Sequence, residues 1–115
     1  MKFEEALEII SKEFETRRIV DTCHSIVTGM SYDGAEGFHV ALYVNAEGEA
    51  IISDLGGTKN FFYHEITLEE WEVMCRENGM EFINGSIVRR FKSMKDLFEY
   101  IDFLDRISDK YFTLN

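Results

Sequence analysis

Residues 38–54, FHVALYVNAEGEAIISD, restrict the fold more than any other part of the chain. Residues 38–44 form a nearly continuous apolar run, which is typical of a strand at the centre of a sheet. Residues 45–48 (NAEG) suit a four-residue hairpin turn in which Gly48 can take a positive φ. Residues 49–54 then return as the second strand. This segment predicts an antiparallel sheet, which other elements of the chain must cover.

Three segments have the apolar spacing of amphipathic helices. In residues 3–16 apolar side chains recur at the spacing of one helical face, and glutamates occupy the opposite side. Residues 67–78 begin with a capping box of Thr67 and Glu70 and end at an Asn-Gly pair. A last helix runs from Ser93 to about residue 111. Its apolar stripe consists of Leu97, Tyr100, Ile101, Leu104, Ile107 and Tyr111.

The other strands follow from β-branched and apolar runs. Residues 19–28 predict one strand, which a glycine-marked loop at 29–37 follows. The Asn-Gly pair at 84–85 lies between two apolar runs and predicts a two-residue hairpin. We therefore expect a single α+β domain over residues 1–115. It should contain an antiparallel sheet of about five strands and three helices, in the order α-β-β-β-α-β-β-α.

Length and composition limit the class of protein. The chain has 115 residues, 45% of them hydrophobic, which suits one domain with its own core. It has no apolar run of about 18 residues, which argues against a membrane span. Its N-terminus lacks a signal-peptide core, so we expect a cytoplasmic protein. Cys23 and Cys75 form no CxxC pair, and we predict two buried thiols rather than a disulfide framework.

Charge is the most distinctive property of the chain. The net charge is −10, from 22 acids and 12 bases, which repels nucleic acid and favours basic partners. Each of the three predicted helices carries acids on its outer side. We predict that acids of the last helix contact a partner, and the loop at 29–37 is a second candidate. The predicted contact residues are Asp96, Glu99, Asp102, Asp105 and Asp109. The alternative is that these outer faces only keep the protein soluble.

Residues 51–60, IISDLGGTKN, resemble the first phosphate loop of the sugar-kinase and actin-like ATPases. That fold needs two large lobes, a second phosphate loop and an adenosine-binding segment, for which the rest of this chain offers no match. We therefore predict no ATP binding. Gly56 and Gly57 should instead let the chain reverse, Asp54 should cap the turn, and residues 58–63 should run back extended.

Two alternatives involve other chemistry. The histidines, His24, His39 and His64, lack the short spacings of metal ligands. The fold could still assemble them with Asp54 into the site of a small enzyme. A basic cluster could instead serve a nucleic-acid-associated regulator, and it consists of Arg89, Arg90, Lys92 and Lys95. Our first hypothesis includes no catalytic residue, metal or cofactor.

The order of elements also resembles that of a known family. A hairpin ends in a Ser-Asp-x-Gly segment and is followed by a helix, a glycine-marked hairpin and a final Leu/Phe-rich helix. The residues that carry the likeness are Ile52, Asp54, Gly56, Gly79, Met80, Phe82, Phe91 and Leu97. In these features the chain is similar to a family of uncharacterised small domains of bacteria, phages and mobile elements. The resemblance implies an α+β domain in a phage or mobile-element setting, and it implies no activity.

Together these features favour a non-enzymatic interaction module that binds a protein with a basic surface. In its most specific form, this hypothesis describes a phage or mobile-element inhibitor of a host nucleic-acid-binding enzyme. An acidic surface of this kind can occupy a basic groove that is shaped for nucleic acid.

Overall fold

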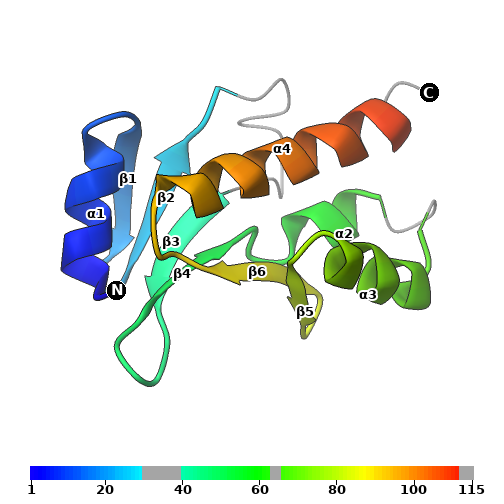
Figure 1. Cartoon of the computed structure of the whole chain (residues 1–115), viewed down its shortest axis with the longest axis horizontal. Coiled ribbons are helices and arrows are strands. Elements are labelled where there is room, and N and C mark those ends of the chain that lie inside the picture. Colours follow the sequence, from blue (N-terminus) through cyan, green and yellow to red (C-terminus); the bar gives the residue numbers. More distant parts are fainter. Residues whose placement is uncertain (30–39, 63–65, 112–115) are drawn as a thin grey trace.

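The computed structural model describes residues 1–29, 40–62 and 66–111. Within these ranges the chain forms six strands and four helices (Figure 1). In chain order they are α1 (Phe3–Ser11), β1 (Glu15–Val20), β2 (Cys23–Val27), β3 (Val40–Val44), β4 (Ala50–Ser53), α2 (Gly57–Phe61), α3 (Leu68–Glu77), β5 (Glu81–Ile83), β6 (Ser86–Arg90) and α4 (Met94–Tyr111). No helix in this described part is long and apolar enough to cross a membrane.

The strands form one antiparallel sheet in the order β1-β2-β3-β4-β6-β5. The predicted α+β class and antiparallel sheet are confirmed. The hairpin of β3 and β4 turns at residues 45–48, and Gly48 has a φ of 80° as expected. The Asn84-Gly85 turn joins β5 to β6, and both residues have positive φ. These two hairpins were predictable because each turn is encoded next to the strands that it joins.

Helices α1, α3 and α4 pack on the same face of the sheet. Residues directly opposite one another in an antiparallel pair point to the same side, and one such row consists of His24, Leu42, Ile52 and Arg89. Phe3 of α1 lies against the His24 ring, with 5.5 Å between ring centroids, and Asp96 of α4 binds Arg89. Trp71 of α3 stacks on Phe82, whose strand partner Ile87 belongs to the same face. The outer sides of these helices therefore point away from the sheet.

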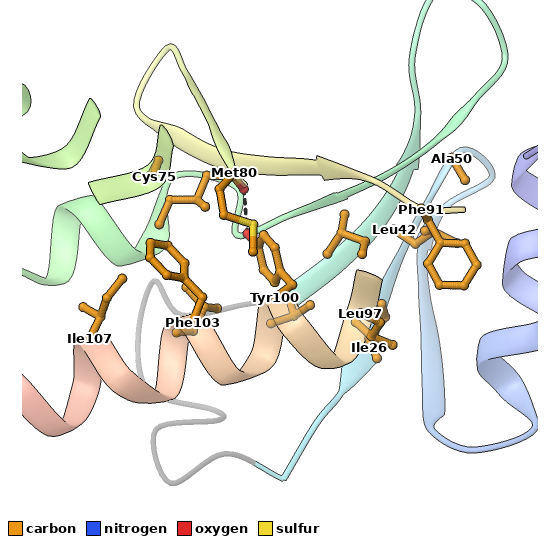
Figure 2. Close-up of a cluster of buried hydrophobic side chains, with 14 of the residues drawn as sticks. Ile26, Leu42, Ala50, Cys75, Met80, Phe91, Leu97, Tyr100, Phe103 and Ile107 are labelled. Atoms are coloured by element: carbon orange, nitrogen blue, oxygen red, sulfur yellow. Dashed lines mark hydrogen bonds between the residues drawn. The ribbon is translucent and has the colours of Figure 1, made fainter. Parts of the chain in front are cut away.

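The core lies between this helical layer and the sheet. The predicted stripe of α4 is buried at Leu97, Tyr100, Leu104 and Ile107. Figure 2 shows Leu97, Tyr100, Phe103 and Ile107 projecting from α4 into one apolar cluster. Each large apolar side chain buried in this way contributes about 1.5–3 kcal/mol relative to an exposed one. This stripe is the main reason why α4 is held against the sheet.

The first third of the chain differs from the prediction. The helix expected at residues 3–16 ends at Ser11, and the strand expected at 19–28 is a hairpin of β1 and β2 that turns at Asp21 and Thr22. Strand β1 is an edge strand with mostly exposed residues. Because neither of its faces is buried, it lacks the alternating pattern that would reveal a strand. The sheet therefore has six strands rather than about five.

The fourth helix, α2, occupies most of the segment expected to be extended at residues 58–63, of which residue 63 lies outside the described part. Leu55 and Gly56 turn the chain with φ values of 53° and 81°, and Gly57 is already the first residue of α2. The expectation that both glycines serve the reversal is thus wrong for Gly57. A helix forms here because the first turn of α2 finds a hydrogen-bond acceptor in a preceding carboxylate.

Candidate functional site

Asp54 is the acceptor at the start of α2, and its side chain is completely buried. Its Oδ1 accepts hydrogen bonds from the backbone N–H groups of Gly56 and Ile87, each at 3.0 Å. Its Oδ2 accepts one from the N–H of Thr58 at 3.2 Å. In the Gly-Gly-Thr turn, the amides of Gly56 and Thr58 are therefore directed at the Asp54 carboxylate, and the amide of Gly57 donates to the Asp54 carbonyl. In a phosphate loop such amides would be directed at a nucleotide.

Ile87 links this turn to α4. Its N–H donates to Asp54, and its carbonyl accepts a hydrogen bond of 2.6 Å from the Tyr100 hydroxyl. Asp54 thus joins the end of β4, the start of α2 and Ile87 of β6 in one largely buried polar network. The predicted turn-capping role of Asp54 is confirmed, and the carboxylate extends it across the sheet. The network is a structural junction.

Burial also shifts the acidity of the groups around Asp54. Loss of hydration raises the pKa of Asp54, although the N–H groups that it binds act in the opposite direction. Burial, together with the nearby Asp54 charge, raises the pKa of the Cys75 thiol to about 12. Cys75 is therefore a protonated core thiol at neutral pH. Cys23 is half-buried, and burial raises its pKa as well.

The structure gives little support to a site built from histidines and Asp54. His24 lies on β2, separated by β3 from β4, so about 10 Å lies between its Cα and that of Ile52. Asp54 is used by the turn, while His39 and His64 lie outside the described residues. In the ranges that the structure describes, no group of three or more potential ligands could hold a metal ion.

The predicted contact acids of α4 divide into two kinds. Asp96 is buried and contacts residues that precede the helix. Its carboxylate accepts the N–H groups of Lys92 at 2.8 Å and Ser93 at 3.1 Å, and it binds Arg89. Burial opposes ionisation of Asp96, but these hydrogen bonds and the guanidinium outweigh it and lower the pKa. The expectation that Asp96 faces outward is therefore wrong, because its charge is needed at the start of α4.

The other four acids lie nearer the surface. Glu99 is half-exposed and forms ion pairs with Arg89 at 2.6 Å and Lys95 at 3.7 Å. Asp102 is exposed and pairs with Arg106 one turn later. Asp105 is half-buried, and Asp109 is exposed. Lys95 and Arg106 thus compensate two of these acids, and α4 does not present a uniform negative face.

The structure describes the basic cluster at residues 89–95 but almost none of the candidate loop at residues 29–37. Arg89 is half-buried between Asp96 and Glu99, so its charge is compensated. Arg90 and Lys92 are exposed. Of the loop predicted at 29–37, only Gly29 belongs to the described residues. The cluster therefore offers less positive charge than its sequence indicates.

The outer side of α3 is a more acidic surface, and the sequence interpretation did not single it out. Its exposed acids are Glu69, Glu70, Glu72 and Glu77. Two apolar side chains on the same helix are also solvent-exposed, Leu68 at 57% and Val73 at 42%. The sequence contained one signal for this surface. Val73 is apolar but does not share the helical face of Trp71 and Cys75, so the amphipathic pattern predicts that it is exposed.

Side chains of α3 and of the C-terminal part of α4 line a groove that adjoins this surface, and Figure 1 shows where the two helices lie. Its main part has a volume of about 440 Å³, and a hollow of about 160 Å³ adjoins it. Met74 and Lys110 line both parts. Since the two helices come from segments about 30 residues apart, only the folded structure brings these linings together.

Protein-family models, curated proteins and solved structures offer no match to this chain. The resemblance to a family of small bacterial and phage domains stays a prediction.

Proposed function

We propose that this protein is a non-enzymatic acidic module that binds a protein partner through the partner's basic surface. The proposal rests on the negative charge that α1, α3 and α4 direct away from the face of the sheet on which they pack. The exposed acids on them are Glu4, Glu5, Glu8, Glu69, Glu70, Glu72, Glu77, Asp102 and Asp109. They account for much of the net charge of −10.

Electrostatics support this role in two ways. A surface with an excess of one charge attracts partners of the opposite sign and accelerates their association. It also repels the phosphates of nucleic acid, which makes direct nucleic-acid binding unfavourable. A basic protein groove is therefore a better complement to these helices than an acidic polymer.

In its most specific form, the proposal is that the partner is a nucleic-acid-binding enzyme of a host cell, which this protein inhibits. Such enzymes expose basic grooves, and carboxylates can replace phosphates as ligands of Lys and Arg. The phage or mobile-element setting implied by the sequence resemblance agrees with this form. Inhibition of such an enzyme is the narrower proposal, and binding to a basic protein surface is the broader one.

Capture of a partner from host cells, followed by kinetics with the purified partner, tests the proposal. The association rate should fall as salt rises, and neutralising the outer acids should flatten that dependence. A suitable variant combines Glu4→Gln, Glu69→Gln and Glu77→Gln, all at exposed positions of α1 and α3. The matched control combines Glu13→Gln, Glu47→Gln and Glu81→Gln, which remove the same charge from exposed residues outside the helices. A partner whose association rate ignores both salt and the acidic variant would contradict the proposal.

The inhibitor form has a separate test. If the partner binds nucleic acid, this protein should displace the nucleic acid in a competition assay, and the acidic variant should displace it less well. Simultaneous binding of both ligands would refute inhibition by competition but would leave the interaction module intact.

A further inference from the structure

The groove between α3 and α4 has an apolar floor and charged rims. Met74 of α3 contributes to the floor of the main part, and Val73 adds apolar surface beside Glu69 and Glu77. Phe103 and Ile107 of α4 line the adjoining hollow. Val73, which is 42% exposed and lies between Glu69 and Glu77 on α3, leaves apolar surface in contact with water, and covering that surface is favourable.

The two rims differ in charge. Three carboxylates lie along α3, at Glu69, Glu70 and Glu77, whereas α4 contributes Arg106 and Lys110. The N–H and hydroxyl of Thr67 lower the pKa of Glu70, and the Lys110 charge adds to this effect. Lys110 thus faces Glu70 across the groove. The α3 rim keeps an excess of negative charge.

We propose that this α3–α4 groove binds an amphipathic helix of a protein partner, with apolar side chains on the floor and Lys or Arg along the flank that meets α3. The proposal rests on the proposed function as an acidic interaction module. It adds where the partner binds and in which conformation.

The chemistry of the groove favours a helix over an extended peptide. Both walls are helices whose backbone N–H and C=O groups are paired within their own turns. An extended segment in the groove would find no backbone partners, in contrast to one added to a sheet edge. A helix satisfies its own backbone and presents side chains at the i, i+4 spacing. Glu69, Val73 and Glu77 are placed on α3 at that same spacing.

The charge of the α3 rim selects among helices. A flank of lysines or arginines would lie beside Glu69 and Glu77 and would complement them, whereas an acidic flank would be repelled. The volume of about 440 Å³ falls within the range of roughly 300–1,000 Å³ that is typical of ligand-binding clefts. The site therefore suits a few apolar anchors framed by positive charge.

The experiment uses the full chain and a fluorescein-labelled designed helix of Leu and Lys, with its lysines along one flank. A scrambled peptide of the same composition is the peptide control. Fluorescence anisotropy gives both dissociation constants, and amide NMR shifts map the contact surface. The amphipathic helix should bind at least about tenfold more tightly than the scrambled peptide, with shifts at Val73, Met74 and Ile107.

Matched variants on α3 separate the groove from general charge. Glu77→Lys should weaken binding of the helix about fivefold, while Glu72→Lys makes the same charge change outside the groove and should alter it less than about twofold. Val73→Asp should weaken binding about tenfold, while Leu68→Asp should not. Circular dichroism melts confirm that each variant is folded.

The results of these measurements distinguish the helix-binding groove from the broader proposal of an acidic interaction module. Equal losses in Glu77→Lys and Glu72→Lys, or NMR shifts confined to α1, would overturn the groove and leave the acidic module standing. If neither peptide binds even at low salt, both the groove and the module are wrong.

Discussion

Replacement of Asp54 tests the central structural claim about the glycine-containing turn. In Asp54→Ala the N–H groups of Gly56, Thr58 and Ile87 lose their acceptor. An unsatisfied buried donor costs about 1–3 kcal/mol. Two of these three hydrogen bonds are fully buried, and release of a desolvated carboxylate offsets part of the loss. We expect the free energy of unfolding to fall by about 4 kcal/mol.

Asp54→Asn is the milder change. The amide oxygen can still accept from Gly56 and Ile87, but the amide NH₂ would face the N–H of Thr58, where a donor meets a donor. We expect a loss of about 2 kcal/mol. Urea titrations of both variants measure these losses, with Glu72→Ala on exposed α3 as the control, which should change stability by less than about 0.5 kcal/mol. If Asp54→Ala is no less stable than Glu72→Ala, the junction assigned to Asp54 does not stabilise the fold.

The pH dependence provides a second check of the same group. Because the folded-state pKa of Asp54 is raised above its ordinary value of 3.8, the folded protein takes up the proton before the unfolded chain does. The contribution of this group to stability therefore increases as pH falls from above the folded pKa toward 3.8. The stability difference between wild type and Asp54→Asn should widen as pH falls from 7 toward 4. A difference that narrows over this range would refute the assigned shift.

Four further predictions concern Asp96 and the glycine-containing turn. Asp96→Asn should lower the free energy of unfolding by about 2–3 kcal/mol because it breaks a largely buried contact with Arg89. Asp102→Asn, on the exposed side of α4, should change it by less than about 0.5 kcal/mol. Similar urea midpoints for the two variants would contradict this prediction. The pKa of Asp96 in the folded protein is lowered from 3.8. The stability that its carboxylate contributes should therefore persist down to pH 3.8 and be lost as pH falls through the lower folded pKa. A stability difference between wild type and Asp96→Asn that vanishes already near pH 6 would contradict the lowered pKa. Gly56→Ala should cost about 1–2 kcal/mol because the residue has a φ of 81°, and unchanged denaturant melts would show that the turn is assigned incorrectly. ATP with Mg²⁺ should leave the melting temperature unchanged, whereas a ligand at 100 times its Kd would add about 2.7 kcal/mol; a rise of several degrees would mean that the Gly-Gly-Thr turn does bind nucleotide.

The sequence by itself determined the elements whose signals are local. The β3–β4 hairpin, the Asn84-Gly85 turn and the capping box of Thr67 and Glu70 were all predictable. In each, the residues that make the contacts lie within a few positions of one another. The apolar stripe of α4 was predictable for the same reason, since helical periodicity is read within a single segment.

Only the tertiary structure decided the features that depend on distant partners. Strand β1 has no alternating apolar pattern in the sequence because its residues are mostly exposed in the folded protein. Asp54 could be assigned to a turn from its neighbours, but its third hydrogen bond comes from Ile87, 33 positions away. In the sequence, Asp96 belongs to an acidic stripe on the outer side of the last helix. In the folded protein its carboxylate instead contacts Arg89 and the backbone at the start of α4. The α3–α4 groove requires both helices to share one face of the sheet, and that arrangement is set by packing of the whole core, which no local pattern encodes.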